Sequence, residues 1–509
     1  MVASLLRVLC SGLQDERLAF RPTLFPFQRV WRATGRFTTQ WVRLDFDNVP
    51  AFGGTGIFRL TRKGHLVTRL FLVAELPDLW SAQRRAAAAL AGGGSGAAWP
   101  RFGWTNSLGH ALIRELTLDI SSARVETLDG QAMEMLDEFY TPFEKVGAAN
   151  EGLRRAATGF GAQTWGWPPA AAVDAVGGRG YNERVVVPLP FWFSRGDIGC
   201  ALPIDAMGVD EVRCGVGFRA LAGLYTTTSL RAGAVDAVDG GVEGSGLVEM
   251  AGSRFYASSD LSGAPLADAG GVIQMPNAAG LGLGECYVMA EYVYLDQNEA
   301  NRFRLADLQV PVVQHQRLAP VDSRGVRGAR VSLEVAQPAR TLMFSCQPWE
   351  APAYNAHFLA TREMTGTVNT LPDGSSYPWW PDADAAALRP GFALSDSEPV
   401  AEVSLEYQGL VRYRSAAGSL FRTVVPCVEA RKAPWINRYY YYFPFGVRGG
   451  FTPFSQPRGE ANWDRMTRKE LVLAFRELRG GGVGRYWIHV LVETYNVLRV
   501  FGGRAGMLF

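Results

Sequence analysis

The sequence predicts an all-β protein made of two consecutive β-sandwiches, with long loops and a few short helices. Runs rich in β-branched and aromatic residues recur along the chain, bounded by turn-forming residues. They stop at 222–284, a stretch dense in Gly, Ala, Ser and Asp, and a second series of strand signals follows. A chain of 509 residues is too long for one ordinary core, and 48% hydrophobic residues supply a packed interior.

The composition excludes several classes of function. The formal charge of +2 argues against bulk nucleic-acid binding, which needs a basic excess on one face. The six cysteines form no CxxC pair, so neither a disulfide framework nor a zinc site is indicated. No apolar run reaches the ~20 residues that a membrane-spanning helix needs. The only lysines are Lys63, Lys145, Lys432 and Lys469, which we interpret as a bias towards arginine in the source genome.

Residues 1–22 are expected to form an N-terminal arm. Leu5, Leu6, Leu9 and Leu13 fall on one helical face. A basic segment does not precede this apolar run, so it makes a poor signal peptide. The arm either packs under the fold or lies on a membrane or a partner.

The first sandwich is predicted at 23–221. The aromatic and β-branched residues of Thr23–Phe46 predict strands. In Ile57–Pro77, apolar and polar residues alternate on both sides of a bend at Lys63-Gly64, which predicts a hairpin. Val186–Ala220 holds a run apolar on both faces, a turn and an alternating run, which predicts neighbouring strands at the closing end. Pro188 and Pro190 lack an N–H, so their strand should lie at an edge, start at a bend or carry a bulge.

Asp129–Val146 is the strongest helix signal in the chain. Met133, Leu136 and Tyr140 line one side. Four carboxylates lie elsewhere on the segment, and we interpret them as a solvated face and not as an acid–base cluster: Glu134, Asp137, Glu138 and Glu144.

The second sandwich is predicted at 285–509, opening with the strand Cys286–Asp296. Residues 222–284 are then a connecting loop on the outer surface. Three further loops are expected at Ser81–Arg101, Gly147–Arg184 and Pro348–Pro399.

Candidate chemistry is sparse, and the sequence predicts no catalytic, cofactor-binding or metal-binding residue and no cofactor. Five histidines are scattered without metal spacing: His65, His110, His315, His357 and His489. We expect His110 to be a core histidine bonded to backbone, and Arg195-Gly196-Asp197 to be a turn. The run Tyr439–Tyr442 should alternate, with two rings in the core and two outside.

Aromatic clusters leave one alternative open. Tyr377–Trp380 and Tyr439–Tyr442 could stack sugars, so a carbohydrate-binding β-sandwich protein is the second hypothesis. A glycosidase would need two carboxylates roughly 5–10 Å apart in a cleft, and no motif indicates such a pair.

Several blocks occur in an order that resembles one known family. They are VPLPFWFSR, ALPIDAM and DEVR within 187–213, the strand Gly64–Pro77, WTNSLGHAL at 104–112, CYVMAEYVYLD at 286–296, and ETYNVLRVFGGRAGMLF at 493–509. Together they resemble the major capsid proteins of nucleocytoplasmic large DNA viruses. One block departs: QPRGEANWDRMT keeps Gln456-Pro457 and Asn462 of the family pattern and lacks its Ser and Cys.

The resemblance implies a double jelly roll of eight strands per sandwich and no enzymatic activity. It further implies homotrimeric, pseudo-hexagonal capsomers that tile an icosahedral shell over an internal membrane. The implied partners are neighbouring capsomers, minor capsid and penton proteins, and no nucleic acid directly. The arm would face the membrane side, and assembly would take place in the host cytoplasm.

Overall fold

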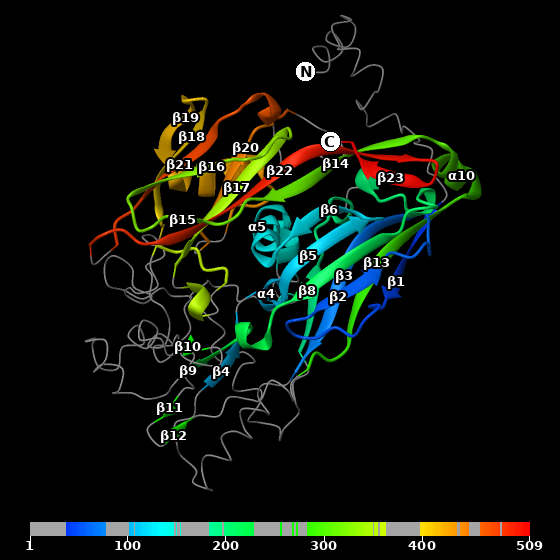
Figure 1. Ribbon diagram of the computed structural model, residues 1–509, viewed down its shortest axis with the longest axis horizontal. Helices are drawn as coiled ribbons and strands as arrows, with labels where there is room; N and C mark the ends of the chain where they lie inside the picture. The colour runs from blue at the N-terminus through cyan, green and yellow to red at the C-terminus, as the bar shows by residue number, and fades with distance from the viewer. Residues whose placement is uncertain are drawn as a thin grey trace, which may run out of the picture.

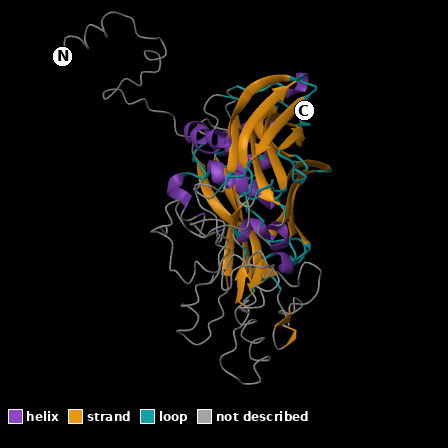
Figure 2. Ribbon diagram, turned by 90° about the vertical axis from the view of Figure 1, so that its left-hand side faces the viewer, coloured by secondary structure: helices purple, strands orange, loops and turns teal. Residues whose placement is uncertain are grey.

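The computed structural model describes residues 37–77, 101–146, 183–228, 282–362, 398–446 and 459–508. Within these ranges it leaves out residues 106, 196, 197, 350, 355, 356, 435–437, 479 and 480. It also describes residues 149, 153, 255–256, 267–268 and 271–272. Strands dominate this part of the chain and run mainly along one direction of the molecule (Figure 2). The predicted arm and most of the connection 222–284 lie outside the described residues.

The first sandwich consists of two antiparallel sheets, in the strand orders β1-β13-β3-β7 and β2-β8-β5-β6 (Figure 1). Its strands are β1 (Phe37–Leu44), β2 (Thr55–Arg59), β3 (Leu66–Leu76), β5 (Ile113–Ile120), β6 (Ala123–Leu128), β7 (Glu183–Pro188), β8 (Val212–Phe218) and β13 (Cys286–Leu295).

The second sandwich repeats this plan with the orders β14-β22-β17-β20 and β16-β21-β18-β19. Its strands are β14 (Leu308–Arg317), β16 (Gly328–Ser332), β17 (Ala339–Pro348), β18 (Val400–Tyr407), β19 (Leu410–Ala417), β20 (Tyr440–Pro444), β21 (Lys469–Phe475) and β22 (Tyr486–Phe501), while β15 (Val321–Asp322) and β23 (Arg504–Met507) add to β22.

The two sandwiches share one topology. When the eight strands of each are counted along the chain, one sheet holds the first, eighth, third and sixth, and the other holds the second, seventh, fourth and fifth. This doubled Greek key is the jelly roll. The predicted double jelly roll of two eight-stranded sandwiches is confirmed.

The boundary between the sandwiches differs from the prediction. The sequence pattern predicts Cys286–Asp296 as the first strand of the second sandwich, but β13 pairs with both β1 and β3. The last strand of a jelly roll closes the sheet that its first strand opens, so a strand that follows a long connection still belongs to the earlier unit. The helix α10 (Gln297–Leu305) leads from one sandwich to the other.

Local predictions within the first sandwich had mixed outcomes. β7 is an edge strand that includes Pro188, as expected, and β5 and β6 pair around a turn at Ser121. The hairpin at Lys63-Gly64 is wrong, because β2 and β3 lie in different sheets and the bend crosses between them. β7 and β8 also lie in different sheets, so they are not neighbours within one sheet.

Short elements complete the described fold. The helices are α4 (Leu108–Leu112), α5 (Gly130–Tyr140) and α12 (Val425–Glu429), the π-helix η8 (Leu420–Val424), and the 3-10 turns η1 (Phe143–Lys145), η2 (Trp192–Ser194), η3 (Ile198–Cys200), η4 (Ile204–Ala206), η5 (Leu221–Gly223), η7 (Ala351–Tyr354) and η9 (Trp463–Arg465). Outside the sandwiches, β4 (Arg101–Trp104), β9 (Tyr225–Thr228) and β10 (Phe255–Tyr256) form a small sheet, and β11 (Ala267–Asp268) pairs with β12 (Gly271–Val272). One hydrophobic cluster continues through both sandwiches, so their cores are joined.

Candidate functional site

The helix α5 lies between the two sandwiches (Figure 1). Asp129 begins it, because its carboxylate accepts a hydrogen bond from the N–H of Ala132 at 2.9 Å. Gly130 permits a close approach, since a Cβ there would lie 2.3 Å from the carbonyl oxygen of His110. Every residue of α5 is buried. The helix therefore belongs to the interior of the protein.

Burial of α5 corrects the prediction of a solvated carboxylate face. Glu134 and Glu138 are 0% exposed, and Asp137 is 9% exposed. Glu144, beyond the helix, is exposed as expected. The sequence pattern separated an apolar side from a polar side correctly, but the polar side faces the second sandwich and not water.

Cations from the second sandwich neutralise the carboxylates of α5. Arg438 forms ion pairs with Glu134 and, at 3.0 Å, with Glu138. The amine of Lys432 lies 3.5 Å from Glu138. On the other side, Glu134 accepts a hydrogen bond from Ser107 at 3.0 Å and contacts Nδ1 of His110 at 2.6 Å. Two units of the fold thus share one charged cluster.

A second cluster surrounds Glu493 of β22. Its carboxylate pairs with Arg195 of the first sandwich at 2.7 Å and accepts a hydrogen bond from the Tyr140 hydroxyl at 2.6 Å. Nε2 of His315 lies 3.5 Å away, and Nδ1 of the same ring contacts Glu126 of the first sandwich. All of these side chains are nearly or fully buried.

The charges at Glu493 are mutually stabilised. Burial alone would raise the pKa of Glu493, but Arg195 and His315 outweigh it and hold that pKa well below its ordinary value. Burial first, and then the Glu493 carboxylate, raise the pKa of Tyr140 well above its ordinary value, so its hydroxyl remains a donor. A buried ion pair with its partners in place is tolerated, whereas removal of one partner leaves an uncompensated charge.

Neutral contacts extend the interface on both sides of the charged clusters. Gln131 of α5 donates to the Ser345 hydroxyl at 3.1 Å, and the ring of Phe139 lies 5.0 Å from that of Tyr442. Gln314 of β14 donates to the carbonyl of Val125 at 3.1 Å. These contacts and the two charged clusters form a joint that fixes one sandwich against the other. We call it the inter-sandwich joint.

The structure brings two of the five histidines to this joint. His110 is in the core, as predicted, and Nδ1 of its ring contacts the Glu134 carboxylate. His357 contacts the carbonyl of Gly223 at 2.6 Å, and His489 contacts Gln347 at 3.0 Å. Within the described ranges, no three His, Cys, Asp or Glu side chains are grouped to hold a metal ion.

The aromatic run at Tyr439–Tyr442 is buried along its whole length, so the expected alternation is wrong. One face of β20 carries Tyr441, which stacks on Phe344 at 4.6 Å inside the second sandwich. The other face carries Tyr442, which α5 covers. Rings enclosed on both faces cannot stack against a sugar. The other cluster, Tyr377–Trp380, lies outside the described residues.

The inter-sandwich joint is not recognisable from local sequence patterns, because its members are far apart in the chain. A signal was nevertheless present: His110, Arg195 and Glu493 each lie inside a block that carried the family resemblance. The tripeptide Arg195-Gly196-Asp197 was interpreted as a turn, and its arginine is the cation of the buried pair with Glu493. Gly196 and Asp197 lie outside the described residues.

Two family models match the chain in tandem. Residues 25–296 match the major capsid protein N-terminus, which is more than half of the 509 residues, and residues 304–506 match the large eukaryotic DNA virus major capsid protein. This chain belongs to the major capsid proteins of large eukaryotic DNA viruses. The junction of the two matches falls at α10, where the strand pairing also separates the sandwiches.

Relatives of this capsid protein occur in several virus groups. The major capsid protein of Frog virus 3 is 22% identical over 479 residues, which cover 90% of this chain and 86% of that protein. The major capsid protein of Phaeocystis pouchetii virus is 21% identical with both chains fully covered. Probable capsid protein 4 of Acanthamoeba polyphaga mimivirus is 24% identical, and the match covers 39% of its length.

Solved structures share the fold of this capsid protein. A chain of the PBCV-1 virus capsid superposes with a TM-score of 0.62 at 16% identity, covering 95% of this chain and 99% of that one. The Faustovirus major capsid protein gives a TM-score of 0.62 at 10% identity, covering 97% and 96%. Family and fold together make this chain a structural virion protein and not an enzyme. Among the described helices, none has the length and apolar character to cross a bilayer.

Proposed function

We propose that three copies of this capsid protein form a trimeric capsomer that tiles an icosahedral shell. The observation that carries the proposal is that one chain holds two sandwiches of the same topology, fixed to each other by the buried joint. Three copies around a threefold axis then present six similar walls. Such a block is nearly hexagonal, and heterologous contacts between blocks extend a shell.

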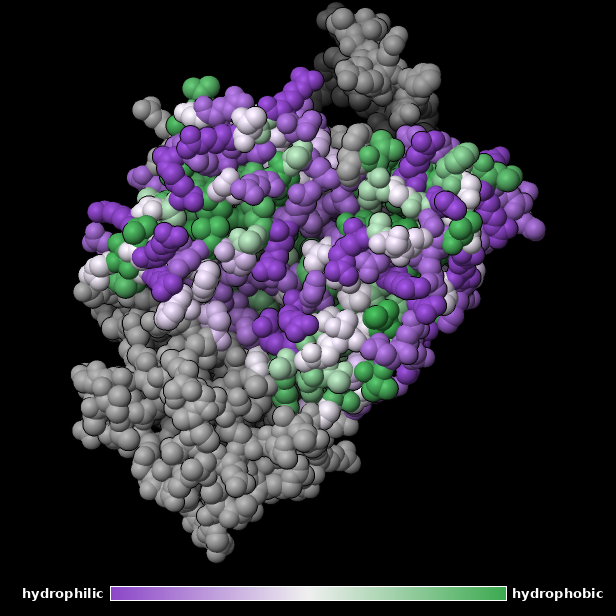
Figure 3. All heavy atoms as spheres, in the orientation of Figure 1, coloured by the Kyte–Doolittle hydropathy of each residue, from purple (hydrophilic) through white to green (hydrophobic). Residues whose placement is uncertain are grey.

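The inter-sandwich joint supports this role mechanically. A capsomer keeps its outline only if the two sandwiches of each chain hold a fixed angle. Breaking a buried, hydrogen-bonded charge pair is costly, so hinge motion at the joint is opposed. The face shown in Figure 3 carries hydrophobic side chains interspersed with hydrophilic ones over both sandwiches, which suits contacts that form and rearrange during assembly.

Native mass measurement of the purified protein tests the proposal. We expect a species of three chains, and electron microscopy should show blocks with a nearly hexagonal outline. A protein that stays monomeric at high concentration would contradict the proposal, whatever its fold.

We further propose that the shell encloses an internal membrane, with neighbouring capsomers, minor capsid and penton proteins as partners and with assembly in the host cytoplasm. The leucine face of the arm 1–22 would contact the membrane side or a minor capsid protein. Deletion of Met1–Gln14 tests the arm: trimers should persist, while shells should fail to form or should lose a partner. Unaltered shells would refute that contact.

A further inference from the structure

One imidazole of the second sandwich closes a hydrogen bond on a turn that follows the first. Nε2 of His357 lies 2.6 Å from the carbonyl oxygen of Gly223. A carbonyl oxygen only accepts, so Nε2 carries a proton and donates it to this bond. On the other side, Gln347 donates to the carbonyl of His357 at 2.7 Å and contacts His489 at 3.0 Å. We call the bond from His357 to Gly223 the imidazole clasp.

The second sandwich supplies a rigid support for this imidazole. The segment 357–362 is fixed by two buried tyrosines of the sheet β14-β22-β17-β20. The Tyr440 hydroxyl donates to the carbonyl of Phe358 at 3.1 Å, and the Tyr486 hydroxyl donates to that of Arg362 at 2.6 Å. The residues of the segment that follow the imidazole are all buried. The clasp therefore has little freedom to move on this side.

The other partner of the clasp leads into the small sheet that lies outside the sandwiches. Gly223 ends the turn η5, and β9 begins two residues later. Thr105, next to β4, donates its N–H to the carbonyl of Leu224 at 2.9 Å. Figure 1 shows β4, β9 and β10 together, below the sandwiches, and β10 contacts η7, which follows β17. The imidazole clasp thus ties the small sheet to the second sandwich.

A fixed positive charge lies beside the clasp. A Cβ on Gly223 would lie 2.9 Å from Cδ of Arg219, so the arginine packs against the residue that His357 contacts. Nε of Arg219 donates to the carbonyl of Ala111 at 2.9 Å, which holds the guanidinium in place. Protonation of His357 in the closed clasp would therefore bring two positive charges together.

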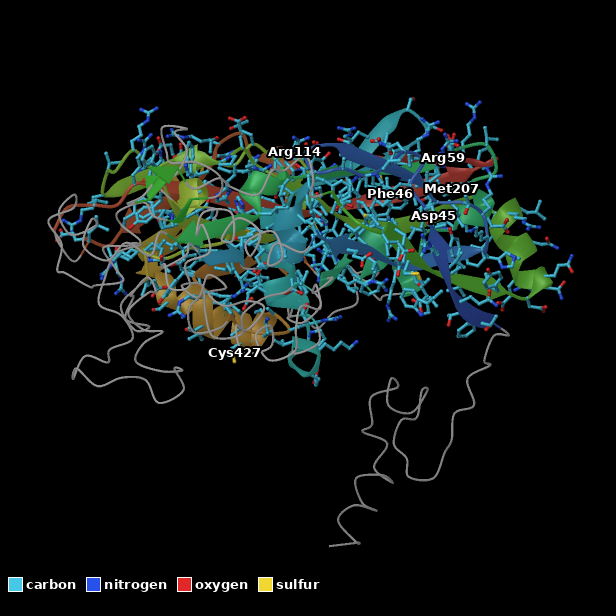
Figure 4. All side chains as sticks on the ribbon, turned by 90° about the horizontal axis from the view of Figure 1, so that it is seen from below. Asp45, Phe46, Arg59, Arg114, Met207 and Cys427 are labelled. Carbon is cyan, nitrogen blue, oxygen red and sulfur yellow. The ribbon has the colours of Figure 1, made fainter. Side chains whose placement is uncertain are left out.

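The charged groups further out do not supply a counter-ion for the imidazole. Asp129 attracts Arg219, but it already forms an ion pair with Arg317 at 3.0 Å. Arg114, which Figure 4 shows near the middle of the molecule, acts on Arg219 as a further cation. On the side of the second sandwich, the neighbour of the clasp is the neutral amide of Gln347. An imidazolium in the closed clasp would meet more positive than negative charge.

The response of the clasp to pH has a defined sign. Burial, and then Arg219, lower the pKa of His357 to about 3, while the bond to Gly223 opposes this shift in part. A hydrated imidazole takes up its proton near pH 6.5. The closed clasp therefore has its full stability above about pH 6.5 and loses it progressively as the pH falls below that value.

We propose that the imidazole clasp is an acid-sensitive switch: in mild acid His357 takes up a proton, the clasp opens, and the small sheet leaves the second sandwich while both sandwiches stay folded. Opening admits water to the imidazole and screens the charge of Arg219. A sheet of three short strands is marginally stable without a surface that covers it, so release should also loosen the small sheet.

Hydrogen exchange of the purified full-length protein tests the clasp. Protection factors, which correct for the pH dependence of the intrinsic exchange rate, are compared at pH 7 and pH 5. The reporters are the amides of Thr105, Gly223 and Leu224, which are hydrogen-bonded in η5 and beside β4. We expect their protection to fall by about tenfold, because one imidazole with a lowered pKa contributes at most about tenfold per pH unit below pH 6.5. The amides of β5 and β17 should keep their protection.

Two substitutions of the imidazole should act in opposite directions. His357→Gln keeps an N–H donor for Gly223 and takes up no proton, so the reporter amides should stay protected at pH 5. His357→Arg carries its charge at both pH values and should leave the reporters unprotected at pH 7. The control is His65→Gln, which removes an imidazole elsewhere in the first sandwich and should retain the wild-type response.

Three outcomes would overturn the proposal. The reporters of the wild type could keep equal protection at both pH values, or their loss could persist in His357→Gln. If β5 and β17 lose protection together with the reporters, acid unfolds the whole protein and the clasp is not the site of its action. The inference concerns a contact inside one chain and goes beyond the proposed capsomer. It can fail while trimers form, and it can hold for a protein that forms none.

Discussion

Arg195 of the first sandwich and Glu493 of the second form a 2.7 Å ion pair whose side chains are 6% and 0% exposed. They are separated by 298 positions in the sequence, so the pair forms only when both sandwiches have folded and docked. The Tyr140 hydroxyl and His315 complete the surroundings of the carboxylate. The pair thus couples the stability of each sandwich to their relative placement.

Removing the cation of this pair should destabilise the whole protein. Arg195→Met leaves Glu493 buried without its closest cation, which costs about 3–5 kcal/mol for a pair of this kind. Equilibrium unfolding in urea at fixed protein concentration measures the loss. The exposed pair Arg499–Asp307, at 2.8 Å, supplies the control variant Asp307→Ala, for which we expect a much smaller change. Equal effects of the two substitutions would contradict the role assigned to the joint.

Stability should also fall as the pH drops below the ordinary histidine range. Burial, and then Arg219, lower the pKa of His357 to about 3, while burial and Arg317 lower that of His489 to about 4. The unfolded chain takes up protons near pH 6.5, and the folded chain does so only near these lower values. Each histidine therefore removes up to about 1.4 kcal/mol of stability per pH unit as the pH falls through this window.

The measurement is the free energy of unfolding between pH 7 and pH 4. His489→Gln, which retains a polar group near Gln347, should flatten the curve over this range. His65→Gln is the control variant, because it removes an imidazole from a partly buried position in the first sandwich. If the free energy of unfolding of His489→Gln falls with pH as steeply as that of the wild type, His489 does not contribute to the pH dependence.

Strand signals and one helix were predictable because they depend on local spacing. The alternation in β5 and the Asp129 cap of α5 need only a few adjacent residues to be recognised. The burial of Glu134 was not predictable in this way, since the cation that permits it is Arg438, 304 positions further on. Amphipathic spacing identifies the two sides of a helix but not what the polar side contacts.

The lysines also show that sequence composition does not reveal which charged side chains are buried. Their rarity was interpreted as a compositional bias, yet Lys432 and Lys469 are both buried. Lys432 faces Glu138 across the joint, and Lys469 is enclosed by backbone carbonyls.

The boundary between the sandwiches was predicted wrongly for a related reason. Chain order suggests a boundary at the long connection, and only the pairing of β13 with β1 shows that β13 belongs to the first sandwich.

Two glycines at helix starts should resist substitution. Gly130→Ala would place a Cβ 2.3 Å from the His110 oxygen, and Gly418→Ala would place one 2.7 Å from the Val400 oxygen. Backbone must then shift at each site, which we expect to cost about 1–3 kcal/mol. Gly208→Ala is the control, because a Cβ there meets nothing within 4 Å. Thermal unfolding of the three variants compares them, and a Gly130→Ala protein as stable as the control would exclude the steric account.

Lys469 offers the sharpest test of a buried cation that backbone carbonyls hold. Its amine donates to three carbonyl oxygens, those of Val335 at 2.8 Å, Met466 at 2.9 Å and Trp463 at 3.0 Å. Lys469→Met keeps an unbranched side chain as far as Cε and removes the amine and its three N–H donors. Since each buried carbonyl left without a donor costs about 1–3 kcal/mol, and the segment can relax in part, we expect a loss of about 2–4 kcal/mol.

The control for Lys469→Met is Lys63→Met, at an exposed lysine in the bend between β2 and β3. Urea unfolding should separate the two variants clearly. The loss should depend little on salt, because three backbone carbonyls hold the amine and the exposed Asp464 adds only a screened attraction. A strongly salt-dependent loss, or one equal to that of Lys63→Met, would mean that the carbonyls around Lys469 find other donors.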